Sequence, residues 1–137
     1  MSKYVMDACA LLAFINDEIG AGKVEEMLEK AQNGEIEIYM NKVNLLEIYY
    51  GIYREEGAYK ADETYQLILK QVIYINDKLS EKIFKEAGRL KAKYKISLAD
   101  AIVLGESIVR KASVLSSDHH EFDILEQKED IDFDWIR

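Results

Sequence analysis

The sequence predicts an α/β fold with a mostly parallel central sheet, and two observations support this. Tyr4-Val5-Met6 is a short apolar strand that runs directly into Asp7, and residues 8–15 continue as a helical segment. A strand this apolar is usually covered on both faces, as in parallel sheets. Strands then alternate with helices, which is typical of βαβ units. Finally, the 137 residues contain no proline, linker or repeat, so we expect a single domain, 1–137.

Four further elements follow in the N-terminal half. Residues 17–34 carry apolar residues at helical spacing and end in an Asn-Gly helix stop. Residues 35–40 alternate polar and apolar side chains, as a strand near a sheet edge would. A helix opens at Asn44 and ends by Gly57, and residues 58–71 form another helix.

The C-terminal half continues the alternation. Its predicted elements are a short buried strand at 72–75, helices at 80–94 and 97–110, a strand at 113–116, a turn at 119–126 and a last strand at 131–136. In the first of these helices Ile83, Ala87 and Leu90 lie on one face, which is the face expected to pack on the sheet.

Composition narrows the class of protein. The 18 Lys and Arg against 26 Asp and Glu give a net charge of −8, which argues against a broad nucleic-acid surface but not against a nuclease with a small basic track. Cys9 is the sole cysteine, so no internal disulfide can form and a reducing cytoplasm is expected. We expect Cys9 to be a small buried residue. No apolar run is long enough to span a membrane.

Four acids share one kind of position in the predicted fold. Asp7 and Asp118 each follow the end of a strand, whereas Glu47 and Asp100 each lie in the first turn of a helix. In a parallel sheet these positions meet at the carboxyl edge, where ligands bind in open α/β folds. Two carboxylates about 5 Å apart repel by around 3 kcal/mol at an effective dielectric near 20. A hard divalent cation, Mg²⁺ or Mn²⁺, makes such a cluster tolerable and favours hydrolysis of a phosphodiester by an activated water.

Each acid also has a purely structural interpretation. The segments 44–47 and 97–100 both match the capping-box pattern, in which the acid bonds back to the cap residue. Asp7 could cap the helix that follows it, and Asp118 could be a turn residue. The tyrosines at 49, 50 and 53 could stack bases or could simply pack.

The chain resembles the PIN-domain family, and within it the VapC-like toxins of prokaryotic toxin–antitoxin pairs. The resemblance rests on four segments in order: Tyr4-Val5-Met6-Asp7, Asn44-Leu45-Leu46-Glu47-Ile48 followed by Gly51, Leu98-Ala99-Asp100-Ala101-Ile102-Val103, and Ser116-Ser117-Asp118 with Phe122. Two positions depart from the family pattern. Asn44 stands where Ser or Thr is common, although it can still cap a helix, and Phe122 lies one residue further from Asp118.

The resemblance implies a three-layer α/β/α fold and a Mg²⁺- or Mn²⁺-dependent ribonuclease. Asp7, Glu47 and Asp100 would take the first three acidic positions and Asp118 the fourth, with Ser116 steadying the site. It further implies a homodimer in the cytoplasm and a cognate antitoxin protein that covers the acidic pocket and replaces the cation with an arginine. The RNA substrate would be cut by a metal-activated water.

Two rival functions remain at this stage. One is a non-catalytic PIN-like module that binds RNA or a protein without cleaving. The other is a different Mg²⁺-dependent phosphate enzyme, such as a phosphatase or a receiver-type domain. Such proteins usually place a second acid close to the first, and Asp17 and Glu18 are too far from Asp7 for that.

Overall fold

A computed structural model describes residues 1–137. The elements are β1 (Ser2–Met6), α1 (Ala8–Ile15), α2 (Ala21–Gln32), β2 (Ile36–Asn41), α3 (Lys42–Glu56), α4 (Ala58–Leu69), β3 (Tyr74–Asn76), α5 (Glu81–Lys93), α6 (Leu98–Arg110), β4 (Ser113–Ser116), α7 (His119–Lys128) and β5 (Phe133–Trp135). No helix is both long and apolar enough to cross a membrane.

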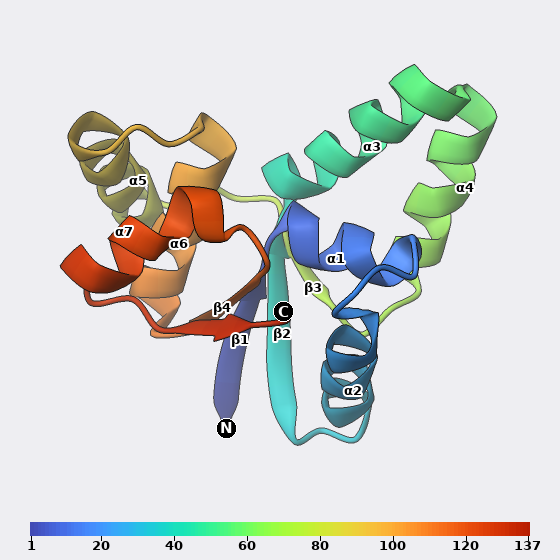
Figure 1. Ribbon diagram of the computed structural model, residues 1–137, viewed down its shortest axis with the longest axis horizontal. Coiled ribbons are helices and arrows are strands. Elements are labelled where there is room, and N and C mark those ends of the chain that lie inside the picture. The colour runs from blue at the N-terminus through green and yellow to red at the C-terminus, as the bar shows by residue number, and fades with distance from the viewer.

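The central sheet has five strands in the order β3-β2-β1-β4-β5, and every neighbouring pair is parallel. Helices α1 to α4 lie on one side of this sheet, and α5 to α7 lie on the other (Figure 1). The predicted α/β class and the three-layer α/β/α arrangement are therefore confirmed. The chain builds outward from β1 through β2 to β3 and then returns to the other side of β1 as β4. This reversal makes the carboxyl ends of β1 and β4 a topological switch point, where ligands bind in such folds.

Alternation along the central strands divides the core into two halves. Met6 and Leu115 belong to the cluster that packs against α1, α2 and α3, whereas their neighbours Val5 and Val114 belong to the cluster under α5, α6 and α7. Successive strand residues point to opposite faces, so both faces of β1 must be apolar. This explains why Val5 and Met6, the two buried residues directly before Asp7, are both apolar.

One strand assignment is confirmed and one needs correction. The strand predicted near a sheet edge at 35–40 is β2, which lies one strand in from the edge, between β1 and β3. Its Tyr39 is partly covered by the Arg110 guanidinium, 3.9 Å from the ring centre. The segment predicted as a buried strand at 72–75 is instead β3, the edge strand. Its Tyr74 is 61% exposed because no strand follows it on that side.

The segment 119–126, predicted as a turn, is most of helix α7. The Asp118 side chain caps this helix by accepting from the Glu121 N–H at 3.2 Å. Phe122 and Leu125 are fully buried and three residues apart, so one face of the helix packs into the core. An aspartate followed by a short amphipathic stretch is a helix start as well as a turn signal, and here the apolar spacing decided the outcome.

Helices α5 and α6 pack unusually closely. A Cβ added at Gly105 would lie 3.0 Å from the backbone nitrogen of Ala87, so only glycine permits this approach.

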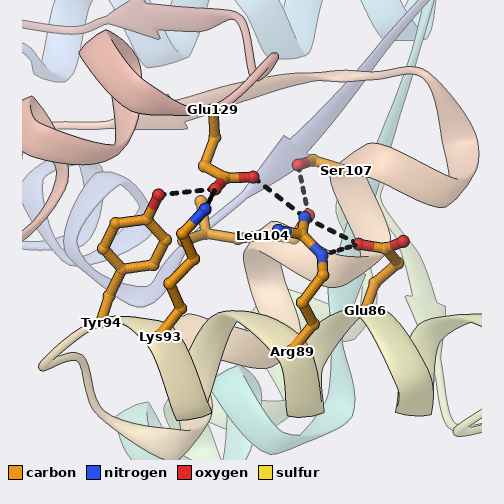
Figure 2. A network of polar contacts seen from close by, with 7 residues as sticks. All are labelled: Glu86, Arg89, Lys93, Tyr94, Leu104, Ser107 and Glu129. Carbon is orange, nitrogen blue, oxygen red and sulfur yellow. Dashed lines mark hydrogen bonds and ion pairs between the residues drawn. The ribbon is translucent and has the colours of Figure 1, made fainter.

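Polar contacts tie α5 to the end of α7. Arg89 and Lys93 both pair with the Glu129 carboxylate, and the Tyr94 hydroxyl donates to it at 2.6 Å (Figure 2). These bonds hold the pKa of Glu129 at about 2. The network therefore anchors the layer that carries the N-termini of α6 and α7.

Candidate functional site

Asp7 lies at the carboxyl end of the middle strand and is only 2% exposed. Its backbone N–H extends the β1–β4 pairing by donating to the Leu115 carbonyl at 3.2 Å. One side-chain oxygen accepts from the Ala10 N–H at 2.9 Å, and the other accepts from the Ser116 hydroxyl at 2.5 Å. Asp7 thus does cap α1, as one interpretation expected, but it also faces the neighbouring strand.

Ser116 connects two of the acids. While its hydroxyl donates to Asp7, the same oxygen accepts the Asp118 backbone N–H at 3.0 Å. Ser116 is fully buried at the end of β4, so its geometry is fixed by the sheet. A single hydroxyl therefore sets the position of the Asp118 backbone relative to the Asp7 carboxylate.

Glu47 and Asn44 lie one turn apart on the inner side of α3, but the predicted helix start is wrong. The cap of α3 is Asn41, whose side chain accepts from the Val43 N–H at 2.8 Å. The capping box expected over 44–47 does not form, and Asn44 lies inside the helix. Its amide nitrogen instead donates to the Ala99 carbonyl at 3.5 Å, which links α3 to α6.

A buried carboxylate holds this strand–helix junction in place. Glu106 of α6 is fully buried and accepts from the Asn41 and Asn76 amides, at 3.3 and 3.2 Å, and from Arg110 at 2.7 Å. Since Asn41 is also the cap of α3, Glu106 ties the helix that carries Glu47 to the helix that carries Asp100. No motif in the sequence points to Glu106 as a structural residue. The signal that could have found it is a glutamate within the otherwise apolar run of α6.

Asp100 lies in the first turn of α6. The Ser97 hydroxyl caps this helix by accepting from the Asp100 backbone N–H at 3.1 Å. The predicted cap at 97 is therefore present, and it uses the backbone N–H of Asp100, while a bond from Ser97 also lowers the pKa of the Asp100 carboxyl.

These segments surround one cleft of about 300 Å³ at the carboxyl edge of the sheet. All four predicted acids line it, together with Asn44 and Ser97. The full lining is Asp7, Ala8, Cys9, Leu12, Asn44, Glu47, Tyr50, Ser97, Asp100 and Asp118. Base stacking and simple packing were both open for Tyr50, which lines the cleft, whereas the prediction that Cys9 is buried is wrong. Cys9 is in fact exposed, because the first turn of α1 presents it to the cleft rather than to the core.

The electrostatics of the cleft raise the pKa values of three of its carboxyl groups in the absence of a cation. Burial raises the pKa of Asp7 to about 7, against bonds from Ser116 and Ala10 that lower it, and the charges of Asp100 and Asp118 raise it further. Burial likewise raises the pKa of Asp100 to about 6, with added repulsion from Asp118 and Glu47. Burial also raises the pKa of Glu47. The site therefore holds negative charge at a cost that a bound cation would relieve.

The same field disables the cysteine as a nucleophile. Although Cys9 is exposed to the cleft, the walls around it desolvate its thiolate, and the negative charges of Asp7, Asp118, Asp100 and Glu47 add to this, so the pKa of the thiol is raised to about 12. Because the thiolate is the reactive form of cysteine, a thiol held protonated in this way is inert near neutral pH.

The donor set fits a hard divalent cation. Carboxylate and amide oxygens are the ligands that Mg²⁺ and Mn²⁺ prefer. The Asn44 side-chain oxygen is buried and has no hydrogen-bond partner, which leaves an acceptor unused in the wall of the cleft. An unsatisfied buried acceptor costs about 1–3 kcal/mol, so a ligand that donates to it would be stabilised. No three His, Cys, Asp or Glu side chains are placed to hold one ion directly. The arrangement therefore suits an ion held by one or two carboxylates that keeps several waters, as Mg²⁺ usually does.

Helix capping and charge clustering at α6 can be separated by two substitutions. In EDTA we expect Asp100→Ala to be neutral or stabilising, because it removes a partly buried charge that other acids repel. Ser97→Ala should instead cost about 0.5–2 kcal/mol, since it removes the cap itself. Urea unfolding measures both, and added Mn²⁺ should stabilise wild type but not Asp100→Ala. If Asp100→Ala were as destabilising in EDTA as Ser97→Ala, the carboxylate would be acting as a structural cap.

Comparison with solved structures identifies related folds. Similar chains occur in a VapBC2 complex from Rickettsia felis bound to a DNA fragment from its promoter, with a TM-score of 0.74 and 15% identity over 97% of this chain and 98% of that one. A chain of a DNA-bound VapBC from Salmonella typhimurium matches with a TM-score of 0.74 and 14% identity over the whole of both chains. A chain of VapBC-1 from nontypeable Haemophilus influenzae matches with a TM-score of 0.73 and 14% identity over 98% of both chains.

Sequence comparison locates the family directly. Curated proteins include no significant sequence match. The PIN domain profile, however, matches residues 4–127, a span that contains all four acids of the cleft, the end of β1 and the whole of β2, β3 and β4. The order of the acids, the parallel sheet and this match agree, and the chain belongs to the PIN-domain family.

Proposed function

We propose that this protein is a metal-dependent endoribonuclease, the toxin of a toxin–antitoxin pair. The observation that carries the proposal is the convergence of Asp7, Glu47, Asp100 and Asp118, from four separate segments, on one cleft at the switch point of the sheet. Membership of the PIN-domain family and the likeness to chains of VapBC complexes support it.

The proposed roles of the residues follow from how firmly each is held. Asp7 is the fixed anchor, because both of its oxygens are oriented by Ser116 and by the first turn of α1. Glu47, Asp100 and Asp118 are half-buried, and because the Asp118 side chain also caps α7, Glu47 and Asp100 are the acids most able to turn toward a ligand in the cleft. When bound, Mg²⁺ or Mn²⁺ lowers the pKa of a water and neutralises charge on a phosphate oxygen. Hydrolysis forms a bond from the water oxygen to phosphorus and breaks the bond to the departing oxygen, which takes a proton.

Substrate binding has to overcome the negative charge of the protein. Tyr50 lines the cleft and is 45% exposed, and the Arg54 guanidinium lies 5.4 Å from the centre of its ring. An aromatic ring beside a cation can stack a base and contact a phosphate. We therefore place single-stranded RNA along the α3 rim of the cleft.

The partner we propose is an antitoxin protein. A second hollow of about 290 Å³ lies between α3 and α4, which project beyond the sheet (Figure 1). Its lining is mainly apolar and consists of Lys42, Leu45, Leu46, Tyr49, Asp62 and Tyr65. An antitoxin segment could occupy this hollow while an arginine enters the acidic cleft in place of the cation. A homodimer that acts on RNA in the cytoplasm completes the proposal.

The proposal is tested by incubating the purified protein with total cellular RNA in Mn²⁺ or in EDTA. We expect RNA fragments in Mn²⁺ and intact RNA in EDTA, and an RNA 5′-end analysis should show discrete cut sites. RNA that stays intact in Mn²⁺, or equal fragmentation in both conditions that persists in an Asp7→Asn preparation purified in the same way, would contradict the proposal.

A second candidate function is a non-catalytic PIN-fold module that binds RNA or a protein. It is favoured by one observation, namely that no three acidic side chains are already placed around a common ion. Calorimetry with Mn²⁺ separates the candidates, because a module that only binds RNA or protein needs no metal. Absence of Mn²⁺ binding together with tight RNA binding would favour the module.

A further inference from the structure

Asn44 is the one buried polar side chain in the acidic cleft that is left incompletely bonded. It is 1% exposed, and its oxygen is the only buried side-chain nitrogen or oxygen in the protein without a hydrogen-bond partner. The other buried asparagines use their oxygens: Asn41 accepts from Val43, and Asn76 accepts from the Lys78 N–H at 3.1 Å. Buried polar groups are almost always satisfied, so an exception at a ligand site calls for a partner.

The orientation of the Asn44 amide follows from its neighbour in α6. Its nitrogen donates to the Ala99 carbonyl, one residue before Asp100, so the oxygen is the atom left without a partner. Asn44 also lies three residues before Glu47 on α3, which places the two side chains on the same side of that helix. The unused oxygen is therefore held between the helices that carry Glu47 and Asp100, and no protein donor reaches it.

We propose that Asn44 is the neutral member of the metal site and that its side-chain oxygen accepts a hydrogen bond from a water carried by the divalent cation. This inference rests on the proposed metal-dependent function. An ion that keeps several waters presents donors only, because its waters direct their hydrogens outward. The carboxylates of the cleft make it negative and one or two of them hold the ion, whereas Asn44 supplies an acceptor that adds no further repulsion to a crowded cleft. Asn44 thus acts through the ion's water shell and positions it.

The test compares Mn²⁺ binding by isothermal calorimetry for wild type, Asn44→Leu and Asn44→Asp. Loss of an outer partner of a metal site typically weakens binding about 10–100-fold, and we expect Asn44→Leu to lose affinity within that range. Asn44→Asp keeps the acceptor and should bind Mn²⁺ at least as tightly as wild type. Folding stability in EDTA should rank the two variants the other way. Asn44→Asp should have the lower free energy of unfolding, because it adds a charge to the acidic cleft.

The matched control is Asn76→Leu, which removes a buried asparagine whose oxygen is already bonded outside the cleft. It should lower thermal stability and leave the Mn²⁺ dissociation constant within about twofold of wild type, a difference small against the loss of about 10–100-fold expected for Asn44→Leu. If Asn44→Leu does not fold, Asn44→Ala replaces it in the same comparison. If wild type binds Mn²⁺ and the Asn44 variants bind it with the same dissociation constant, the proposed role of Asn44 is overturned and the metal-dependent function is not. Absence of Mn²⁺ binding by wild type would overturn the proposed metal-dependent function as well.

Discussion

Asp7→Asn should abolish Mn²⁺-dependent RNA cleavage, with a loss in kcat/KM of about a thousandfold or more. A metal ion supplies several kcal/mol of transition-state stabilisation, and about 4 kcal/mol corresponds to a factor of 10³. Asp7 is the most rigidly held acid of the cleft, so its charge cannot be replaced by movement of a neighbour. The measurement is the initial rate of cleavage of a labelled single-stranded RNA at saturating Mn²⁺.

The substitution is well suited to the question because asparagine preserves the local structure. Its oxygen can still accept from the Ala10 N–H and cap α1, and its nitrogen can donate to the Ser116 hydroxyl oxygen. Asp77→Asn is the control, since Asp77 is exposed and lies outside the cleft. It should leave the rate unchanged. Full activity of Asp7→Asn would show that this carboxylate takes no part in cleavage.

The position of the acids could be predicted because it depends on chain order and strand ends. The apolar run 4–6 fixed β1 as a strand covered on both faces, and the alternation of elements fixed a parallel sheet. Once those are known, any residue directly after a strand lies at the carboxyl edge. The prediction for Asp7 and Asp118 therefore needed no knowledge of side-chain contacts.

The helix starts were harder to predict because several polar residues compete to cap each helix. Asn41 and Asn44 are both good caps, and what selected Asn41 was its bond to Glu106, a residue 65 positions away in the sequence. Sequence spacing cannot reveal such a long-range contact. For the same reason the unused oxygen of Asn44 became visible only when the packing of α3 against α6 was known.

The second large effect is on stability, which in EDTA should fall as the pH rises from about 4 to about 7. The pKa of Asp7 is about 7 in the folded protein, against a usual value of 3.8. Between these values the folded state keeps a proton that the unfolded state has lost, so raising the pH favours unfolding. A difference of about three pKa units corresponds to at most about 4 kcal/mol of unfolding free energy. Asp100, with a pKa of about 6, changes stability in the same direction.

Two other groups must be separated from this effect. The pKa of Glu129 is lowered from 4.5 to about 2, so the stability that this carboxylate contributes is lost as the pH falls below 4.5. This loss lies mainly below the pH range in which Asp7 titrates. His119 has a raised pKa, from bonds to the Arg137 carbonyl and Asp123, and therefore also favours lower pH. The informative quantity is the difference between wild type and Asp7→Asn in urea unfolding at each pH. That difference should grow in favour of Asp7→Asn as the pH rises, because the variant has no charge to bury at this position.

Mn²⁺ should reverse the trend, since the cation binds the ionised carboxylates and releases their protons. At saturating Mn²⁺ the free energy of unfolding of wild type should increase as the pH rises from 5 to 7. The size of the increase depends on the ratio of the Mn²⁺ concentration to the Mn²⁺ dissociation constant. Asp7→Asn should gain much less. A wild-type stability curve that is flat in EDTA over this range would mean that the carboxyl of Asp7 stays ionised in the folded protein without a cation. The cleft would then be more open to water than its burial indicates.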